Sequence, residues 1–268
     1  MIKWIRLGFS CGPLVLRANC KMKKFIKHKD KYSIEERTKA VRDYCKSISH
    51  GGFRTRFIVE GEENIPADTQ AVYVGNHRSV LDPILFYALT DFPCTVVAKK
   101  EVEKMPIFGN VIKAIDGFFL DRGNLRAELQ TFREINKELK ENSNLSLLIY
   151  PEGTRSKAPD FNLLDFHAGT FKIATKLGLP ICPFVMYHTD RILNQQFHYH
   201  RYPVQVAFLK PLTKEEYENM TGDEISSLLH SKIEAEIEKM KAKEEELIMQ
   251  YNSYSKKKAQ RVMRYKNR

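Results

Sequence analysis

A histidine and an aspartate five residues apart are the most chemically specific feature of the sequence. They lie in the run Gly75-Asn76-His77-Arg78-Ser79-Val80-Leu81-Asp82-Pro83, directly after the apolar run 71–74. A carboxylate that accepts a hydrogen bond from one imidazole nitrogen fixes the tautomer of the ring, and the other nitrogen can then take a proton from a hydroxyl. The pair therefore predicts general-base chemistry, with His77 as the base and Asp82 as the residue that orients it.

The same stretch also has the composition of a helix start. Ser79 and Asp82 have the spacing of a capping box, and Pro83 suits a first helical turn, so Asp82 could simply cap a helix that runs through residues 84–88. On one continuous helix, five residues turn two side chains about 140° apart. The catalytic interpretation therefore requires His77 in a strand-to-helix turn and Asp82 in the first turn of the helix.

Three further blocks follow in order along the chain. They are Gly117-Phe118-Phe119-Leu120-Asp121-Arg122, then Tyr150-Pro151-Glu152-Gly153-Thr154-Arg155-Ser156, then Pro180-Ile181-Cys182-Pro183-Phe184. The forked guanidinium of arginine matches phosphate oxygens, and a glycine lets backbone N–H groups come close to an anion. The second and third blocks therefore predict a site for a phosphate group.

Together the four blocks resemble the glycerolipid acyltransferase family, and most closely the bacterial-type lysophosphatidic acid acyltransferases, which are 1-acyl-sn-glycerol-3-phosphate acyltransferases. That family carries N-H-x4-D, a phosphate-binding arginine, P-E-G-T-R-S and a proline-containing apolar block, and the resemblance covers roughly residues 50–210. Its pattern K-x2-L-x6-G-x12-R is matched by Lys99, Val102, Gly109 and Arg122, with Val102 in the place of the leucine.

The resemblance implies transfer of a fatty acyl group from a thioester, acyl-CoA or acyl carrier protein, to the 2-hydroxyl of lysophosphatidic acid, which gives phosphatidic acid. Direct attack is expected, because the sequence has no Gly-x-Ser-x-Gly elbow for an acyl-enzyme. Glu152 is expected to orient the substrate through a glycerol hydroxyl or to pair with an arginine. The expected phosphate-binding residues are Lys99, Arg122, Gly153, Thr154 and Arg155. No metal and no cofactor beyond the thioester co-substrate is expected.

The positive charge of the chain is concentrated at its two ends. Residues 1–60 hold fifteen Lys and Arg against five Asp and Glu, and residues 251–268 hold seven Lys and Arg and no acid. Such ends suit an anionic surface, either membrane or nucleic acid. Aromatic residues interleaved as in single-strand binding platforms are scarce in the basic runs, so an anionic phospholipid membrane surface is the expected partner and nucleic acid is not.

The N-terminal segment has the pattern of an interfacial anchor. Residues 2–16 are mostly apolar but fall short of the ~20 residues that span a bilayer, and Lys3 and Arg6 interrupt them. Gly12-Pro13 is expected to kink or end a helix, and a basic run rather than a cleavage site follows. The segment predicts peripheral binding at the cytoplasmic face of a membrane, the alternative being a helix packed on the core. Five cysteines without a C-x-x-C pair favour a reducing cytoplasm.

Alternating strand and helix patterns predict an α/β fold, a layered mixed sheet flanked by helices. The expected strands are 56–59, 71–74, 95–98, 117–120, 145–150, 181–186 and 204–208, and the expected intervening helices are 84–89, 126–139 and 170–177. Pro183 inside a strand indicates an edge or a bulge. The expected organisation is a basic two-helix membrane-docking unit (1–52), a catalytic domain (53–212) and a C-terminal helical tail with a basic end (213–268). Ser33-Ile34-Glu35-Glu36 has the pattern of a capping box at the start of the second N-terminal helix. The tail is expected to carry one apolar helical stripe, which consists of Ile225, Leu228, Leu229, Ile233, Ile237 and Met240.

Other functions remain open from the sequence. The enzyme could acylate another lysophospholipid or glycerol 3-phosphate. A non-catalytic basic membrane-binding protein would use the charged ends and treat the four blocks as packing. A metal-assisted hydrolase would need further carboxylate or histidine ligands near His77.

Overall fold

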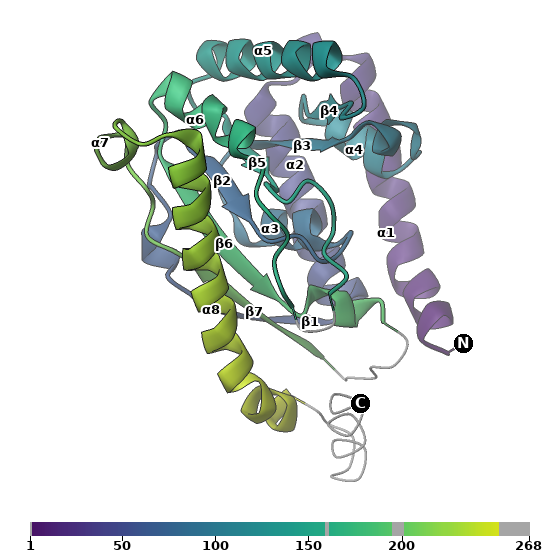
Figure 1. Cartoon of the computed structure of the whole chain (residues 1–268). Coiled ribbons are helices and arrows are strands. Elements are labelled where there is room, and N and C mark those ends of the chain that lie inside the picture. Colours follow the sequence, from purple (N-terminus) through teal and green to yellow (C-terminus); the bar gives the residue numbers. More distant parts are fainter. Residues whose placement is uncertain (1, 159–160, 195–200, 252–268) are drawn as a thin grey trace.

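The computed structural model describes residues 2–158, 161–194 and 201–251, and a seven-stranded sheet lies between two layers of helices (Figure 1). The strand order is β1-β7-β6-β2-β5-β3-β4. The strands are β1 (Thr55–Glu60), β2 (Val72–Gly75), β3 (Cys94–Lys99), β4 (Phe118–Leu120), β5 (Ser146–Ile149), β6 (Ile181–Tyr187) and β7 (Tyr202–Phe208). All seven correspond to strands that the sequence predicts.

The sheet is mixed, as the sequence predicts. Strands β6 and β7 pair antiparallel, and every other neighbouring pair is parallel. Strands β6, β2, β5, β3 and β4 therefore all run in one direction. The segments that follow these five strands emerge at the same edge of the sheet, where ligands bind in open parallel sheets.

Helices cover both faces of the sheet (Figure 1). One layer consists of α1 (Ile2–Lys27), α2 (Ile34–Ser47), α3 (Asp82–Leu89) and α4 (Phe108–Ala114). The other consists of α5 (Leu125–Glu141), α6 (Lys172–Leu177), α7 (Lys214–Tyr217) and α8 (Gly222–Tyr251). The buried side chains form one core under each layer. Helix α4 is the element that the sequence patterns did not predict.

The central strands are apolar on both faces because each face has its own helical cover. In β2, Tyr73 belongs to the core under α1–α4, while Val72 and Val74 belong to the core under α5–α8. The same alternation in β5 turns Tyr150, directly after the strand, toward the α1–α4 side. The placement of this tyrosine matters for the site described below.

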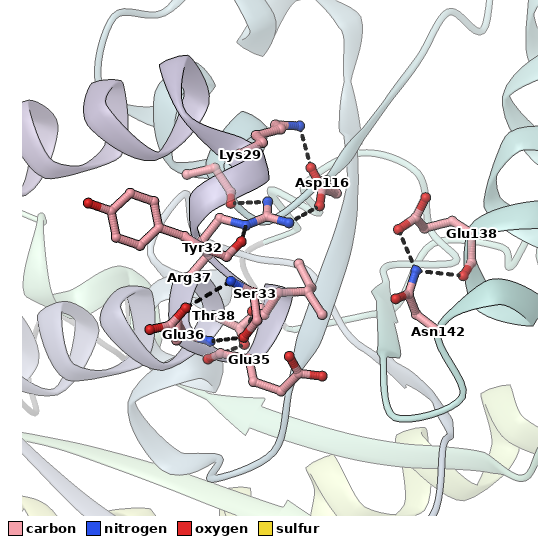
Figure 2. Close-up of polar contacts among 12 residues, drawn as sticks. Lys29, Tyr32, Ser33, Glu35, Glu36, Arg37, Thr38, Asp116, Glu138 and Asn142 are labelled. Atoms are coloured by element: carbon pink, nitrogen blue, oxygen red, sulfur yellow. Dashed lines mark hydrogen bonds and ion pairs between the residues drawn. The ribbon is translucent and has the colours of Figure 1, made fainter.

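Helix α2 begins with a complete capping box, as predicted. Ser33 accepts from the Glu36 backbone N–H, and the Glu36 side chain accepts from the Ser33 N–H (Figure 2). One turn later, Arg37 donates to the Ala114 carbonyl at 2.8 Å and to Asp116 at 2.6 Å. Lys29 pairs with the other oxygen of Asp116 (Figure 2). These contacts join the N-terminal helices to the turn between α4 and β4.

Helix α1 does not end at Gly12-Pro13; it continues from Ile2 to Lys27 with Pro13 inside it. Cys11 and Met22, on either side of this point, are both buried against the body of the protein. Such packing outweighs the one hydrogen bond that a proline removes, and the carbonyl it leaves unpaired belongs to Phe9, where the helix surface is open to water. The expectation that the helix could end at this point is wrong for this reason.

Pro183 lies in an interior strand, since β6 has β7 on one side and β2 on the other. The expectation of an edge strand is therefore wrong, but the alternative of a bulge is correct. Phe184 pairs with Phe208, and Ile181 pairs with Leu212, so the five residues 208–212 oppose the four residues 181–184 of β6. This extra residue is a β-bulge, and it accommodates a residue without an N–H.

Helix α8 buries the predicted apolar stripe against β6 and β7. Five residues of the stripe are buried, namely Ile225, Leu229, Ile233, Ile237 and Met240, and the sixth, Leu228, is partly buried against the same core. The basic C-terminal end, residues 252–268, lies outside the described residues. Within the described ranges, none of the helices has both the length and the apolarity needed to cross a membrane.

Candidate active site

The expected site residues come from segments that follow neighbouring parallel strands. His77 follows β2, Glu152 follows β5, Arg122 follows β4, and Lys99 is the last residue of β3. Because these strands run in one direction, all four residues emerge at the same edge of the sheet. The strand order thus brings together blocks that are separated by up to 75 residues in the sequence.

His77 and Asp82 form the expected hydrogen-bonded pair. Nδ1 of His77 lies 2.8 Å from Oδ2 of Asp82, and Asp82 is the first residue of α3. Because a carboxylate only accepts, Nδ1 carries the hydrogen and Nε2 is left as the acceptor. The Asp82 side chain is 1% exposed and that of His77 is 19% exposed. The acid is therefore shielded from water, while the imidazole reaches the surface of the site.

The helix-start interpretation of Asp82 is partly correct as well. Oδ2 of Asp82 also accepts from the backbone N–H groups of Arg78 (2.7 Å) and Ser79 (2.8 Å). The Ser79 bond is one half of a capping box, but the reciprocal half is absent, because the Ser79 hydroxyl accepts from the Leu81 N–H instead. Asp82 thus holds the loop before α3 and the imidazole with the same oxygen.

Two neighbours fix the position of the loop that carries His77 from outside. The Asn76 side chain donates to the Met186 carbonyl at 3.0 Å and accepts from the Met186 N–H at 2.9 Å, which binds the end of β2 to β6. The ring of Tyr150 stacks on His77 at 4.3 Å between centroids and 20° between planes. The imidazole is therefore held by the Tyr150 ring against one face and by the Asp82 carboxylate at Nδ1.

Glu152 connects the third block to this loop. Its Oε1 accepts from the His77 backbone N–H at 2.6 Å, and its Oε2 accepts from the Leu164 N–H at 3.0 Å. The residue is buried, and burial raises the pKa of Glu152 against the opposing effect of these two hydrogen bonds. In this structure both carboxylate oxygens are used to hold backbone, including that of the histidine.

Arg122 lies directly against Gly153. A Cβ added to Gly153 would stand 1.7 Å from Nη1 of Arg122, and Gly153 has a φ of +70°. The Gly153 N–H donates to the Tyr150 carbonyl, so the turn itself uses that donor. Partial burial lowers the pKa of Arg122, while the charge of Glu128 acts in the opposite direction. Because Gly153 has no side chain, the guanidinium of Arg122 from the second block can pack directly against the loop formed by the third block.

The other expected phosphate ligands are exposed. Thr154 and Arg155 follow Gly153 at the surface, and within the described residues no ion pair joins Arg122 or Arg155 to an acid. Lys99 lies at the same edge, where it pairs with Glu101 at 3.1 Å across two largely exposed side chains. Such an exposed pair contributes little and is easily exchanged for another anion.

Sequence patterns missed one residue of the site. Thr189, which follows β6 at the same edge, donates to Oδ1 of Asp82 at 2.5 Å. A threonine in a turn carries no signal of its own, and the two residues are 107 positions apart. Asn76 gave a signal as part of N-H-x4-D, but its link to Met186 depends on the β2–β6 pairing.

Comparisons with known proteins identify the family of this part of the chain. An acyltransferase family model matches residues 56–187, which contain His77, Asp82 and the second and third blocks. Residues 56–187 of this chain belong to the acyltransferase family.

Within that family, the curated relatives of this chain include 1-acyl-sn-glycerol-3-phosphate acyltransferases. The one from Saccharomyces cerevisiae is 32% identical over 168 residues, which cover 62% of this chain and 54% of the relative. The one from Borreliella burgdorferi is 28% identical over 186 residues, which cover 66% of this chain and 72% of the relative. The chain spans little more than half the length of the yeast relative and of its plant counterpart from Cocos nucifera.

A solved structure has the same fold. The crystal structure of the 1-acyl-sn-glycerophosphate (LPA) acyltransferase PlsC from Thermotoga maritima superimposes with a TM-score of 0.69 and 23% identity. The match covers 90% of this chain and 95% of that protein.

Proposed function

We propose that the protein transfers a fatty acyl group from a thioester donor to the 2-hydroxyl of 1-acyl-glycerol-3-phosphate, giving phosphatidic acid. The observation that carries the proposal is the pairing of two functions at one sheet edge. A buried acid orients an accessible imidazole, and the guanidinium of Arg122 lies against Gly153, on the loop whose Glu152 also holds the His77 backbone. The names of the relatives support the same acceptor.

In the proposed reaction, Nε2 of His77 takes the proton of the 2-hydroxyl as its oxygen attacks the thioester carbonyl. Asp82 stabilises the imidazolium that forms. When the tetrahedral intermediate collapses, the carbon–sulfur bond breaks and the imidazolium returns the proton to the leaving thiolate. Arg122 and Arg155, with Lys99, hold the phosphate of the acceptor, and a bidentate guanidinium contact fixes its orientation.

The assay uses purified protein on liposomes with lysophosphatidic acid, comparing acyl-CoA with acyl carrier protein as donor. Phosphatidic acid should form with at least one donor, and His77→Ala should lower kcat by about 10²–10⁴-fold. His167→Ala is the matched control, because His167 is exposed and only its backbone contacts the third block. A preference for monoacylglycerol, which lacks the phosphate, would contradict the roles of Arg122 and Arg155.

We also propose that the protein works at the cytoplasmic face of a membrane as a peripheral enzyme. In α1, Phe9 is 81% exposed and Leu16 is 67% exposed, and Lys21, Lys23 and Lys24 follow at the surface. Apolar side chains enter the acyl boundary while lysines meet anionic headgroups. Phe9→Asp combined with Leu16→Asp should weaken flotation with anionic vesicles, whereas Leu129→Asp on the exposed surface of α5 serves as the control. Equal flotation of all three proteins would remove this proposal.

A further inference from the structure

Asp82 has a fourth hydrogen-bond donor that comes from a distant part of the chain. The hydroxyl of Thr189 donates to Oδ1 of Asp82 at 2.5 Å, and neither residue is more than 1% exposed. We propose that Thr189 is a positioning residue of the His77–Asp82 pair, which makes the pair part of a three-residue chain from threonine to aspartate to histidine. The catalytic meaning of this chain rests on the proposed function.

The two oxygens of Asp82 have unequal surroundings. Oδ2 accepts from the His77 ring and from two backbone N–H groups, while Oδ1 accepts from the Thr189 hydroxyl. A buried carboxylate oxygen without a donor is costly, and a hydrogen bond to a charged group is among the stronger ones in proteins. Thr189 therefore fixes the rotation of the carboxylate and disperses part of its charge.

The position of Thr189 is set by the end of β6. His188, the first residue after β6, has a φ of +64°, and this turns the chain back over the sheet edge into the 3₁₀ turn Thr189–Ile192. Arg191 in that turn is buried and forms an ion pair with Glu244 of α8, which is buried as well. The turn is thus anchored to a helix on one side while its first residue contacts Asp82 on the other.

Charge on Oδ1 affects the base through the shared carboxylate. Without the threonine hydroxyl, more negative charge stays on Asp82 and favours the protonated imidazole. The other charged groups near the pair are Glu152, which contacts the His77 backbone, Arg78, which donates to the Ala158 carbonyl, and Asp190 beside Thr189. Thr189→Val changes none of these groups, so a change in pH dependence reports on Thr189 alone.

The test compares Thr189→Val with Thr189→Ser in the acyl-transfer assay. The valine variant should lose about ten- to a hundredfold in kcat, as expected for a misplaced catalytic group. Its KM for lysophosphatidic acid should stay unchanged, and the acidic limb of its profile of kcat/KM against pH should move to higher pH. Serine keeps the hydroxyl and should restore both. The matched control is Thr95→Val, because Thr95 is fully buried and its hydroxyl has no partner.

If the Thr189→Val variant keeps the wild-type kcat and pH profile, the inference about Thr189 is overturned. Acyl transfer by the wild-type protein would still support the proposed function in that case. If the wild-type protein transfers no acyl group, a second measurement still decides whether Thr189 holds Asp82. Thr189→Val should lower the urea midpoint of unfolding in the wild-type background and leave it unchanged or raised in the Asp82→Ala background. Equal effects in both backgrounds would overturn the inference.

Discussion

Replacing Glu152 with glutamine tests whether a buried carboxylate holds His77, the proposed general base, in place. Glutamine has nearly the same shape, but it has one oxygen where the carboxylate has two. Of the His77 and Leu164 N–H groups that now donate to Glu152, one would face an amide NH₂ group instead. The substitution therefore breaks one hydrogen bond and leaves a buried donor opposite another donor.

The magnitude follows from these contacts. A hydrogen bond to a charged group contributes about 1.5–3 kcal/mol. Burial raises the pKa of Glu152, so the fold disfavours its charge, and removing that charge offsets part of the loss. We expect a net loss of about 1–2 kcal/mol in the free energy of unfolding, which lowers Tm by about 2–8 °C. A displaced imidazole should lower kcat by up to about a hundredfold.

Thermal unfolding and steady-state acyl transfer measure the two effects separately. Glu141→Gln is the matched control, because Glu141 lies on the exposed surface of α5 and pairs with Lys137 only at 3.9 Å. Glu152→Gln with wild-type Tm and kcat would refute the reasoning. A variant that raises only the KM for lysophosphatidic acid would show instead that Glu152 acts on the substrate, as the sequence alone suggested.

Three other predictions follow from single contacts. Tyr150→Phe removes a buried hydroxyl without a partner, so the free energy of unfolding should stay the same or rise by up to about 1 kcal/mol. Acyl-transfer activity should persist, and a large loss of activity would assign chemistry to the hydroxyl. Burial opposes the charge of Asp116, but hydrogen bonds from Arg37 and Lys29 outweigh this effect and lower the pKa of Asp116. The stability that the charged Asp116 adds should therefore be fully present above pH 3.8, its ordinary pKa, and should disappear as the pH falls through the lowered pKa of the folded protein. Urea unfolding measured at several pH values should show this dependence, and Arg37→Ala should reduce it. Gly153→Ala should strain the backbone by about 1–2 kcal/mol and displace the Arg122 guanidinium. The KM for lysophosphatidic acid should therefore rise about as much as in Arg122→Ala. An unchanged KM would contradict the proposed role of this contact.

The sequence predicted best what is local in the chain. His77 and Asp82 are five residues apart, so a turn and a helix start suffice to bring them together. The strands were predicted because buried apolar runs bounded by polar segments have few other structures. The capping box at Ser33 was predicted for the same reason, since its two hydrogen bonds lie within one helical turn.

Contacts across the sheet could not be predicted in this way. The space that Gly153 leaves for Arg122 depends on the order β5-β3-β4, which periodicity does not give. Thr189 meets Asp82 because β6 pairs with β2, and nothing in the composition of its turn indicates this. Pro13 was misjudged because local propensity favoured a break, while packing of the residues on either side kept the helix.

The N-terminal helices and Arg122, the proposed phosphate-binding residue, are joined by one short segment. Arg37 of α2 binds Asp116, four residues later β4 ends at Leu120, and Arg122 follows. Few rotatable bonds separate these points, and β4 is paired with β3 along its length. If α1 rests on a membrane through Phe9, as proposed, this connection fixes how far the guanidinium of Arg122 stands from the lipid surface. A substrate that keeps its acyl chain in that surface would then meet the phosphate site and the imidazole in a constant geometry.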